Sequence, residues 1–496
     1  MTRCRRAPMI ALLLLPVFTF ERQESRTVVP RVEWTDLTAI TAPSPDLKTG
    51  VLIVPERRFP ALGVRTIRLP FVIIKSHSAA PHPDSVLFTA GGPGGSTLFQ
   101  LRIRRRSPLL DDRDFVLFEQ RGTRFAEPAL MCPEIQSARR TGWETRLNGD
   151  PDPRVVAEAL TGCAGKLKGE GVDLAAYTTK ESAADIADLR RLLGIRSWNL
   201  YGASYSTKLM LTVLRDHPEG VRSAILDSVL PLEANWDEDG SANILEALEK
   251  IFAVCQEDEA LRAQFPNLRE RFFRFLAEAN RRPIEISTKN PIDGTPFELK
   301  LDGAGIMNCI YAGLEDNSAI PDLPLIIDSA CRGEIDRLAP LAQNYLGSPL
   351  GTALGMRLSV WCNEEYPFEK PEKIRKPAGL PPELASFVQS AVPLEALQSW
   401  PQGHPDPVEN KPVRSGIPIL IAVGEFDPDT PPKWAREAAS FLSKSYLIEF
   451  RGYTHVPLYG HPEAARIMRE FLDDPSRTPD SGQASIRRPF RLSWKE

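Results

Sequence analysis

The sequence lacks an excess of charge of either sign and lacks the common metal motifs. Its 496 residues include 61 Lys and Arg against 65 Asp and Glu, a formal net charge of −4, which does not favour nucleic acid or an anionic membrane as a partner. It contains no C-x-x-C pair, which argues against a zinc or thioredoxin-type site. We therefore expect a small or neutral partner, and no metal or organic cofactor.

Proline, in contrast, is abundant. It accounts for 45 of the 496 residues, about twice its usual share. Because proline locks φ, this suits a loop-rich protein of mixed structure rather than a helical bundle. Apolar residues make up 42% of the chain and charged residues 25%, which excludes a collagen-like, wholly disordered or polytopic membrane protein. A single core rarely grows beyond roughly 250–300 residues, so we expect two structural units or one fold with a large insertion.

The N-terminus has the pattern of an export signal. Three arginines among the first six residues precede a largely apolar run at residues 9–20. This run is shorter than the roughly 20 residues that a membrane-spanning helix needs. We predict a signal peptide at about residues 1–24, export to the periplasm or the medium, and no integral membrane association afterwards. An uncleaved apolar arm is the alternative, since no A-x-A cleavage site follows.

Six cysteines remain after such a signal: Cys132, Cys163, Cys255, Cys309, Cys331 and Cys362. An even number of cysteines in an exported chain favours disulfides, although six cysteines allow 15 pairings. The one local pair that we predict is Cys132 with Cys163.

Short β-branched runs alternate with helical stretches over much of the chain. Strands are expected at residues 67–74, 86–89, 115–118, 198–201, 224–226, 418–423 and 445–449. Helices with apolar residues at helical spacing are expected at residues 183–193, 205–214, 434–442 and 462–472. The succession of strand, helix and strand predicts an α/β fold with a mostly parallel sheet and helices on both faces.

This alternation breaks between about residues 235 and 411. The stretch holds helix-like segments, a Pro-rich run at 370–383 and four of the six remaining cysteines. We predict a mainly helical cap inserted at 235–411 into a core formed by residues 40–234 and 412–474. An irregular tail is expected at 475–496.

The candidate nucleophile is Ser204, in the segment Gly-Ala-Ser-Tyr-Ser at 202–206 between a predicted strand and a predicted helix. A sharp strand-to-helix turn would expose the hydroxyl above the sheet at a helix N-terminus, where backbone amides favour developing negative charge. The pattern is G-x-S-x-S rather than G-x-S-x-G, and the simplest alternative is an ordinary serine N-cap. The assignment therefore depends on partners for Ser204 elsewhere in the chain.

A serine hydroxyl becomes a good nucleophile only when a base accepts its proton. His455 lies in a short loop after a predicted strand, from which it could turn back over the nucleophile. His461 instead looks like the start of the last predicted helix. We predict that His455 is the base.

The carboxylate that would orient this imidazole is expected in residues 424–432, directly after another predicted strand. Asp427 has room to face His455, whereas Asp429 would more naturally cap the following helix. Glu425 is closer to the strand end, and a solvated turn is its simplest interpretation. The resulting order, Ser204, Asp427 and His455, is the order found in hydrolases with such a sheet.

Donors for a tetrahedral oxyanion are expected in the glycine-rich segment at 90–96, which follows a predicted strand. Glycines let the main chain approach a substrate closely, so an amide of Gly91 or Gly92 would act together with the amide of Tyr205. The rival interpretation is a phosphate-binding loop, but neither Gly-Lys-Ser/Thr nor G-x-G-x-x-G is met there.

Four segments together resemble the exported tripeptidyl aminopeptidase and proline iminopeptidase-like branch of the α/β-hydrolases. They are Gly-Gly-Pro-Gly at 91–94, Glu-Gln-Arg-Gly-Thr at 119–123, Gly-Ala-Ser-Tyr at 202–205 and the turn at 424–432. The resemblance runs from about residue 51 to 472, and the part after residue 415 is similar to the C-terminal portion of that branch.

This resemblance implies an α/β-hydrolase fold with a helical cap and a serine exopeptidase that acts on peptide N-termini. It also implies the same nucleophile, orienting acid and base. The chain departs from the pattern of the branch at Ala90, Glu119, Arg124 and Ser206. These departures affect the expected substrate more than the expected fold.

An aminopeptidase must recognise the free ammonium group of its substrate. Glu364 and Glu365, adjacent acids in an apolar part of the insertion, are similar to cap acids of the related family. We predict that one of them pairs with the substrate amine, and a solvated pair of glutamates is the alternative.

The leading hypothesis is an exported aminopeptidase that cleaves peptides with a free N-terminus through an acyl-enzyme on Ser204. The same triad would equally serve an esterase or another acyl hydrolase. A catalytically silent binding protein is the third hypothesis, motivated by Ser206 and Ala90.

Overall fold

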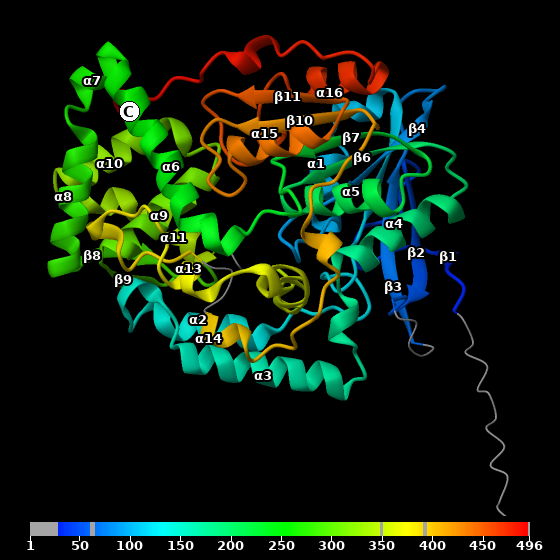
Figure 1. The fold of residues 1–496 in the computed structure, drawn as a ribbon, viewed down its shortest axis with the longest axis horizontal. Coiled ribbons are helices and arrows are strands. Elements are labelled where there is room, and N and C mark those ends of the chain that lie inside the picture. Colours follow the sequence, from blue (N-terminus) through cyan, green and yellow to red (C-terminus); the bar gives the residue numbers. More distant parts are fainter. Residues whose placement is uncertain (1–27, 60–64, 348–350, 390–393, 495–496) are drawn as a thin grey trace, which may run out of the picture.

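A nine-stranded sheet forms the centre of the molecule (Figure 1). The computed structural model describes residues 28–59, 65–347, 351–389 and 394–494, so the predicted signal peptide lies outside the described residues. The order of the strands in the sheet is β1-β2-β3-β5-β4-β6-β7-β10-β11. The strands are β1 (Arg31–Trp34), β2 (Leu47–Pro55), β3 (Thr66–Ile74), β4 (His82–Thr89), β5 (Arg113–Phe118), β6 (Trp198–Ala203), β7 (Val221–Asp227), β10 (Ile419–Gly424) and β11 (Ser445–Phe450).

The sheet is parallel from β5 through β4 and β6 to β11. At the other edge, β1, β2 and β3 pair antiparallel, and β3 joins β5 antiparallel. The mostly parallel sheet confirms the predicted fold class, and the predicted strands coincide with β3 to β7, β10 and β11. Strands β1 and β2 were not predicted from the sequence.

Helices cover both faces of this sheet because successive strand residues point in opposite directions. Leu87 and Leu200 pack against the layer of α4, α5 and α15, while their neighbours Phe88 and Tyr201 pack against the layer of α1 and α16. These helices are α1 (Leu101–Arg104), α4 (Thr179–Leu192), α5 (Tyr205–Asp216), α15 (Pro432–Phe441) and α16 (Ala464–Asp473). None of the helices within the described residues is long and apolar enough to cross a membrane.

Between β7 and β10 the chain folds into a mainly helical cap around an apolar cluster of its own. The cap also contains an antiparallel hairpin of two strands, which the sequence analysis did not predict. Its elements are α6 (Trp236–Glu257), α7 (Glu259–Gln264), α8 (Leu268–Arg281), β8 (Ile284–Lys289), β9 (Pro296–Leu301), α9 (Gly303–Glu315), α10 (Leu323–Cys331), α11 (Ala339–Gly347), α12 (Leu354–Val360), α13 (Pro371–Arg375) and α14 (Leu394–Leu397).

A second excursion of the chain also contributes to the cap. Helices α2 (Pro133–Trp143) and α3 (Pro153–Gly169) leave the core between β5 and α4. In Figure 1 they lie below the cap elements, and α3 packs against α14 within one apolar cluster. Part of the segment that was predicted as core, residues 40–234, therefore helps to build the cap.

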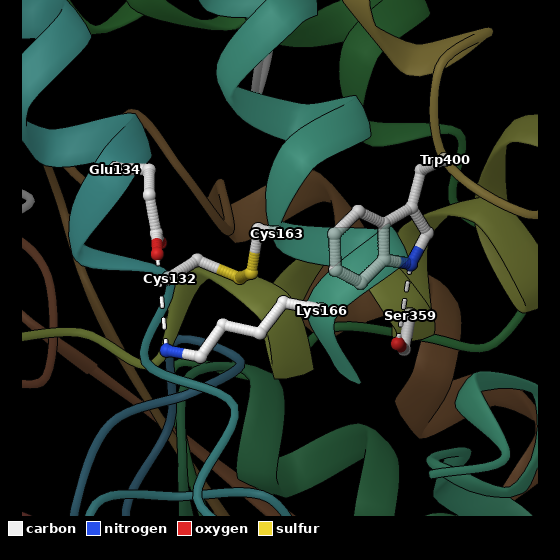
Figure 2. Close-up of a disulfide and its surroundings, with 6 residues drawn as sticks. All are labelled: Cys132, Glu134, Cys163, Lys166, Ser359 and Trp400. Atoms are coloured by element: carbon white, nitrogen blue, oxygen red, sulfur yellow. Dashed lines mark hydrogen bonds and ion pairs between the residues drawn. A yellow bond between two sulfur atoms is a disulfide. The ribbon is translucent and has the colours of Figure 1, made fainter. Parts of the chain in front are cut away.

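A disulfide holds this second excursion together (Figure 2). It joins Cys132, just before α2, to Cys163 on α3, with the two Cα atoms 5.6 Å apart, and this is the pair predicted from the sequence. Close by, the indole of Trp400 donates a hydrogen bond of 3.2 Å to the hydroxyl of Ser359 on α12. The excursion and α12 are thus part of one packed unit. The other four described cysteines are unpaired.

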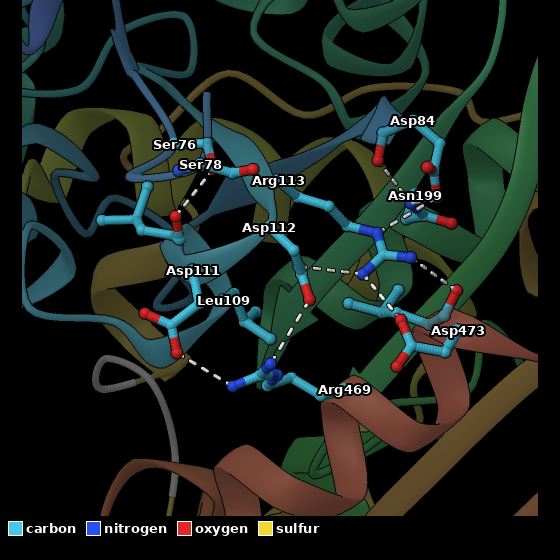
Figure 3. Close-up of polar contacts among 12 residues, drawn as sticks. Ser76, Ser78, Asp84, Leu109, Asp111, Asp112, Arg113, Asn199, Arg469 and Asp473 are labelled. Carbon is cyan, nitrogen blue, oxygen red and sulfur yellow. Dashed lines mark hydrogen bonds and ion pairs between the residues drawn. The ribbon is translucent and has the colours of Figure 1, made fainter. Parts of the chain in front are cut away.

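Buried charge ties the last core helix to the sheet (Figure 3). Arg113, at the start of β5, is almost fully buried and pairs with Asp84 at 3.2 Å and with Asp473 of α16 at 3.0 Å. Arg469 of the same helix pairs with Asp111 at 2.9 Å. Arg113 has carboxylate partners, which is the usual requirement for a charge removed from water.

The chain after α16 lies against the cap and the end of β10. Arg487 pairs with Glu425, and the ring of Phe490 stacks on that of Phe426 with centroids 5.7 Å apart. Glu425 is therefore a buried anchor for the tail and not the solvated turn residue that its position suggested.

Candidate active site

Ser204 occupies the sharp turn between β6 and α5. Its backbone has φ 57° and ψ −131°, a conformation that costs energy for a residue with a side chain and is found where function requires it. Gly202 permits the turn, because a Cβ atom at that position would lie 2.6 Å from the carbonyl oxygen of Ser206. The serine at 206, where the related branch has glycine, is buried and its hydroxyl is hydrogen-bonded to Thr89. This departure from the expected motif is therefore accommodated.

The glycine-rich loop lies directly against this turn. A Cβ atom on Gly91 would come within 2.5 Å of the carbonyl oxygen of Ala203 and 2.8 Å of the Ser204 side chain. Gly92, with φ 123°, lines the same cavity as Ser204 and Tyr205. No acceptor among the described residues pairs with the backbone amides of Gly92 and Tyr205. Both amides are available to an oxyanion formed at Ser204.

Two residues from the Glu-Gln-Arg-Gly-Thr segment hold this loop in place. The amide of Gln120 donates to the carbonyl of Ala90 at 2.6 Å, and the buried carboxylate of Glu119 accepts from the Ser96 hydroxyl and the Leu98 amide. Burial raises the pKa of Glu119 above its ordinary value, and these donors oppose that effect. From the sequence this segment only resembled a motif of related proteins, because its support of the loop depends on tertiary contacts.

His455 and Asp427 meet above the ends of β10 and β11. The imidazole Nδ1 lies 3.0 Å from both carboxylate oxygens. Asp427 also accepts from the hydroxyls of Ser228 at 2.7 Å and Thr430 at 2.9 Å. Burial alone would raise the pKa of Asp427, but the imidazole and these donors hold it below its usual value. This arrangement directs Nε2 of His455 away from Asp427, as a general base requires.

Ser204, Tyr205 and His455 line one cavity of about 300 Å³ between the core and the cap. The structure thus brings the three predicted catalytic residues and the predicted oxyanion loop to a common site. The cap contributes Trp236, Tyr311, Glu315, Arg357 and Trp361 to the walls, and α2 contributes Arg139.

An acidic pair lies in this cavity next to the imidazole. Oδ2 of Asp429 is 4.0 Å from Nε2 of His455, and Oδ1 of Asp429 accepts a hydrogen bond of 2.7 Å from the Tyr311 hydroxyl. Burial and the neighbouring Asp429 raise the pKa of Glu315 well above its usual value. Asp429 does not cap α15, contrary to the expectation from sequence, because the N-cap position falls on Pro431 and no side chain caps the helix.

These carboxylates act on the proton affinity of the base. Burial disfavours the imidazolium, but Asp427 and then Asp429 and Glu315 raise the pKa of His455 to about 10. A single aspartate would orient the ring, whereas the additional acids hold a positive charge at this end of the cavity. The negative charge of Asp427 and Asp429 therefore favours the protonated form of His455 beside the nucleophile.

Glu364 and Glu365 lie elsewhere. Both are buried, but Glu365 forms an ion pair with the buried Lys208 of α5, and Glu364 accepts a hydrogen bond from the Thr179 amide. Neither lines the cavity of Ser204, and Glu364 instead borders a small separate hollow that Lys208 also lines. The turn at Trp361–Glu365 points Trp361 into the cavity and the acids away from it. The acids that line the cavity of Ser204 are instead Asp429 and Glu315, for which no sequence motif gave a signal.

Comparison with known proteins agrees with this architecture. Residues 84–462 match the model of the alpha/beta hydrolase fold family. Because this match covers most of the chain, the protein belongs to the α/β-hydrolase family.

Its curated relatives are distant. The chain is 27% identical over 226 residues to a tripeptidyl aminopeptidase from Streptomyces lividans, covering 42% of this chain and 41% of the relative. It is 27% identical over 143 residues to a proline iminopeptidase from Neisseria gonorrhoeae, covering 28% of this chain and 44% of that one. The matches span less than half the length of these relatives.

A solved proline iminopeptidase from Mycobacterium smegmatis is similar over 83% of this chain and 96% of its own, with 14% identity and a TM-score of 0.36.

Proposed function

We propose that this α/β-hydrolase is a serine peptidase that removes residues from the N-terminus of peptides. The observation that carries the proposal is the acidic pair, Asp429 and Glu315, in the same cavity as Ser204 and His455. A carboxylate beside the catalytic imidazole would hinder an ordinary esterase, because it keeps the base protonated. It has a clear use where the substrate brings an ammonium group.

The ammonium of a bound peptide would pair with Asp429 and neutralise part of the negative charge near His455. Since that charge raises the pKa of the imidazole, pairing lowers it again and makes His455 a base at neutral pH. A substrate without the ammonium would leave the imidazole protonated. Recognition of the amino terminus and activation of the nucleophile are in this way coupled.

The chemistry is acyl transfer through a covalent intermediate. His455 accepts the proton of Ser204 as the hydroxyl attacks the scissile carbonyl, and the amides of Gly92 and Tyr205 stabilise the oxyanion. His455 then donates this proton to the leaving amine, and water releases the acyl group by the same route. The distant aminopeptidase relatives support this substrate class.

The proposal is tested by comparing peptides with free and acetylated N-termini and identifying the products by mass spectrometry. We expect N-terminal fragments from the free peptides only, at a rate abolished by Ser204→Ala. Faster cleavage of a nitrophenyl ester, with no dependence on a free amine, would favour an esterase instead. Labelling of the wild-type protein by a fluorophosphonate probe, absent in Ser204→Ala, would dismiss a catalytically silent protein.

We also propose that the protein acts after export. The support is the predicted signal at residues 1–24 together with the Cys132–Cys163 disulfide, a bond that persists in oxidising compartments. Detection of the mature N-terminus in a periplasmic or culture fraction, rather than in the cytosol, would test it.

A further inference from the structure

Two arginines line the active-site cavity without forming an ion pair to any residue that the structure describes. Arg139 of α2 and Arg357 of α12 both line the cavity of Ser204. Among the described residues, neither guanidinium has a hydrogen bond or an ion pair with a carboxylate, and Nε of Arg357 is buried without any acceptor. The guanidinium carbon of Arg357 lies 5.2 Å from the centre of the Trp361 ring, and its charge opposes the rise in the pKa of Glu315.

Arg139 and Arg357 are partly buried, and the fully buried arginines of this protein differ from them in having carboxylate partners. Arg121 is fully buried and makes a two-pronged contact with Asp185, at 2.8 and 2.9 Å. Arg113 likewise has several carboxylate partners. A guanidinium withdrawn from water normally needs such partners, because an unpaired buried charge is costly. The two cavity arginines therefore look like one half of an interaction whose other half is a ligand.

The two charges are also close enough to disfavour each other. Burial and then the positive charge of Arg357 lower the pKa of Arg139. The charge of Asp150 opposes this effect, but Asp150 is hydrogen-bonded by Tyr345 at 3.5 Å and is not within ion-pair distance of Arg139. An anion between the guanidinium groups would satisfy both, and carboxylate is the group whose geometry their planar donors match.

A second cavity extends the site on this side. It has a volume of about 390 Å³ and shares Arg139, Tyr345 and Gln389 with the cavity of Ser204. Asp150 and Asp302 also line it, and Arg139 is the basic residue that lines both cavities. Chambers of this size hold small ligands, and a peptide of a few residues fits such a site better than a protein chain.

We propose that Arg139 and Arg357 bind a carboxylate of the substrate, so that the cavity selects peptides carrying both a free amino terminus and a carboxylate near the scissile bond. The acidic pair beside His455 takes the ammonium, and the arginine pair takes the anion. This proposal rests on the proposed peptidase function. The carboxylate has two possible sources: the C-terminus of a short peptide, or an aspartate or glutamate side chain.

Binding to the full-length Ser204→Ala protein tests this without turnover. Calorimetry would compare Ala-Ala-Ala, its C-terminal amide, and the amide of Ala-Glu-Ala. We expect the free acid to bind at least tenfold more tightly than the plain amide. If the glutamate-containing amide binds as tightly as the free acid, the side chain is an accepted source; if it binds as weakly as the plain amide, only the C-terminus is.

Arginine variants in the same background then assign the preference. Arg139→Gln and Arg357→Gln should each reduce the preference for the free acid over the amide about tenfold or abolish it, whereas Arg357→Lys should keep part of this preference. Arg140→Gln is the matched control, because Arg140 is the next residue on α2 but is exposed and faces Asp293. Thermal unfolding would confirm that each variant is folded.

Equal binding of the acid and both amides, absence of binding by all three peptides, or a preference that survives both Arg→Gln changes would overturn the proposal. The proposed hydrolase activity is judged separately, from fluorophosphonate labelling and product analysis of the wild-type protein. A failure of one proposal can therefore be told from a failure of the other.

Discussion

Two acidic pairs lie in separate parts of the molecule, and they differ in the partners that the protein gives them. Glu364 and Glu365 are adjacent in sequence, are buried, and have Lys208 and a backbone amide as partners. Asp429 and Glu315 come from distant parts of the chain and line the cavity of Ser204, where Asp429 accepts from the Tyr311 hydroxyl and lies 4.0 Å from Nε2 of His455. The first pair has its partners within the protein, whereas we propose that the second pairs with the ammonium group of a substrate. The cavity that the acids line, more than their adjacency in sequence, therefore distinguishes the two pairs.

Substitution of the catalytic residues should have the largest effect, with which the effects of the two acidic pairs can be compared. His455→Ala or Asp427→Asn should lower kcat/KM by roughly 10⁴-fold, because either change removes a correctly oriented base. Steady-state kinetics on an unblocked peptide anilide would measure the loss, and circular dichroism would show that the fold is retained. A rate within tenfold of the wild type in either variant would remove the triad from the mechanism.

The pair Glu364 and Glu365 should affect stability instead of catalysis. Glu365→Gln leaves the buried Lys208 without its counter-charge, which typically costs about 3–5 kcal/mol of unfolding free energy. Denaturant unfolding would measure this cost. The control is the double variant Lys208→Met/Glu365→Leu, in which both charges are replaced and most of the stability should return. An unaltered stability in Glu365→Gln together with a raised KM would restore the original assignment of the amine site.

The cavity pair should affect catalysis but not stability. Asp429→Asn removes the partner of the substrate ammonium, and we expect kcat/KM for unblocked peptides to fall roughly 10- to 100-fold, the range for a lost charge-assisted interaction. Activity on a neutral ester should not fall. Glu364→Gln serves as the matched acidic change outside the cavity. A similar loss on peptides and esters would show that Asp429 acts on the triad and not on the amine.

The smallest effect should appear in the pH profile. His455 works as a base only when neutral, and Asp427, Asp429 and Glu315 raise its pKa to about 10. With an ester that lacks an amine, kcat/KM should therefore rise with pH into the alkaline range. Asp429→Asn removes a negative neighbour, lowers the pKa of His455 and should shift this rise toward neutral pH. If Asp429→Asn does not shift the pH dependence of kcat/KM, Asp429 does not affect the pKa of His455 in the working enzyme.

Much of the catalytic turn could be predicted because its requirements are local. A strand, a small residue at 202, Ser204 and an amphipathic helix are consecutive in the sequence, and each constrains the next through backbone sterics. His455 and Asp427 follow strands whose carboxyl ends must meet at one edge of a parallel sheet. Their contact at 3.0 Å is thus a consequence of the strand order.

The residues that give the cavity its character could not be found in this way. Glu315 ends a cap helix, Arg139 lies on α2, and Arg357 lies on α12; no local pattern distinguishes them from the many other acids and arginines of the chain. The β8–β9 hairpin and the contribution of α2 and α3 to the cap were missed for a related reason. Their placement depends on contacts between segments far apart in sequence.

The sequence by itself therefore determined the parallel sheet, the turn at Ser204 and the order of the catalytic residues, since these follow from periodicity, glycine placement and short-range geometry. Only the tertiary structure decided which charges have protein partners and which face the cavity. The packing of whole helices and strands decides which groups a side chain contacts. Glu364 and Glu365, neighbours in sequence, therefore pair with a backbone amide and a lysine, whereas Asp429 and Glu315, distant in sequence, line the cavity of Ser204.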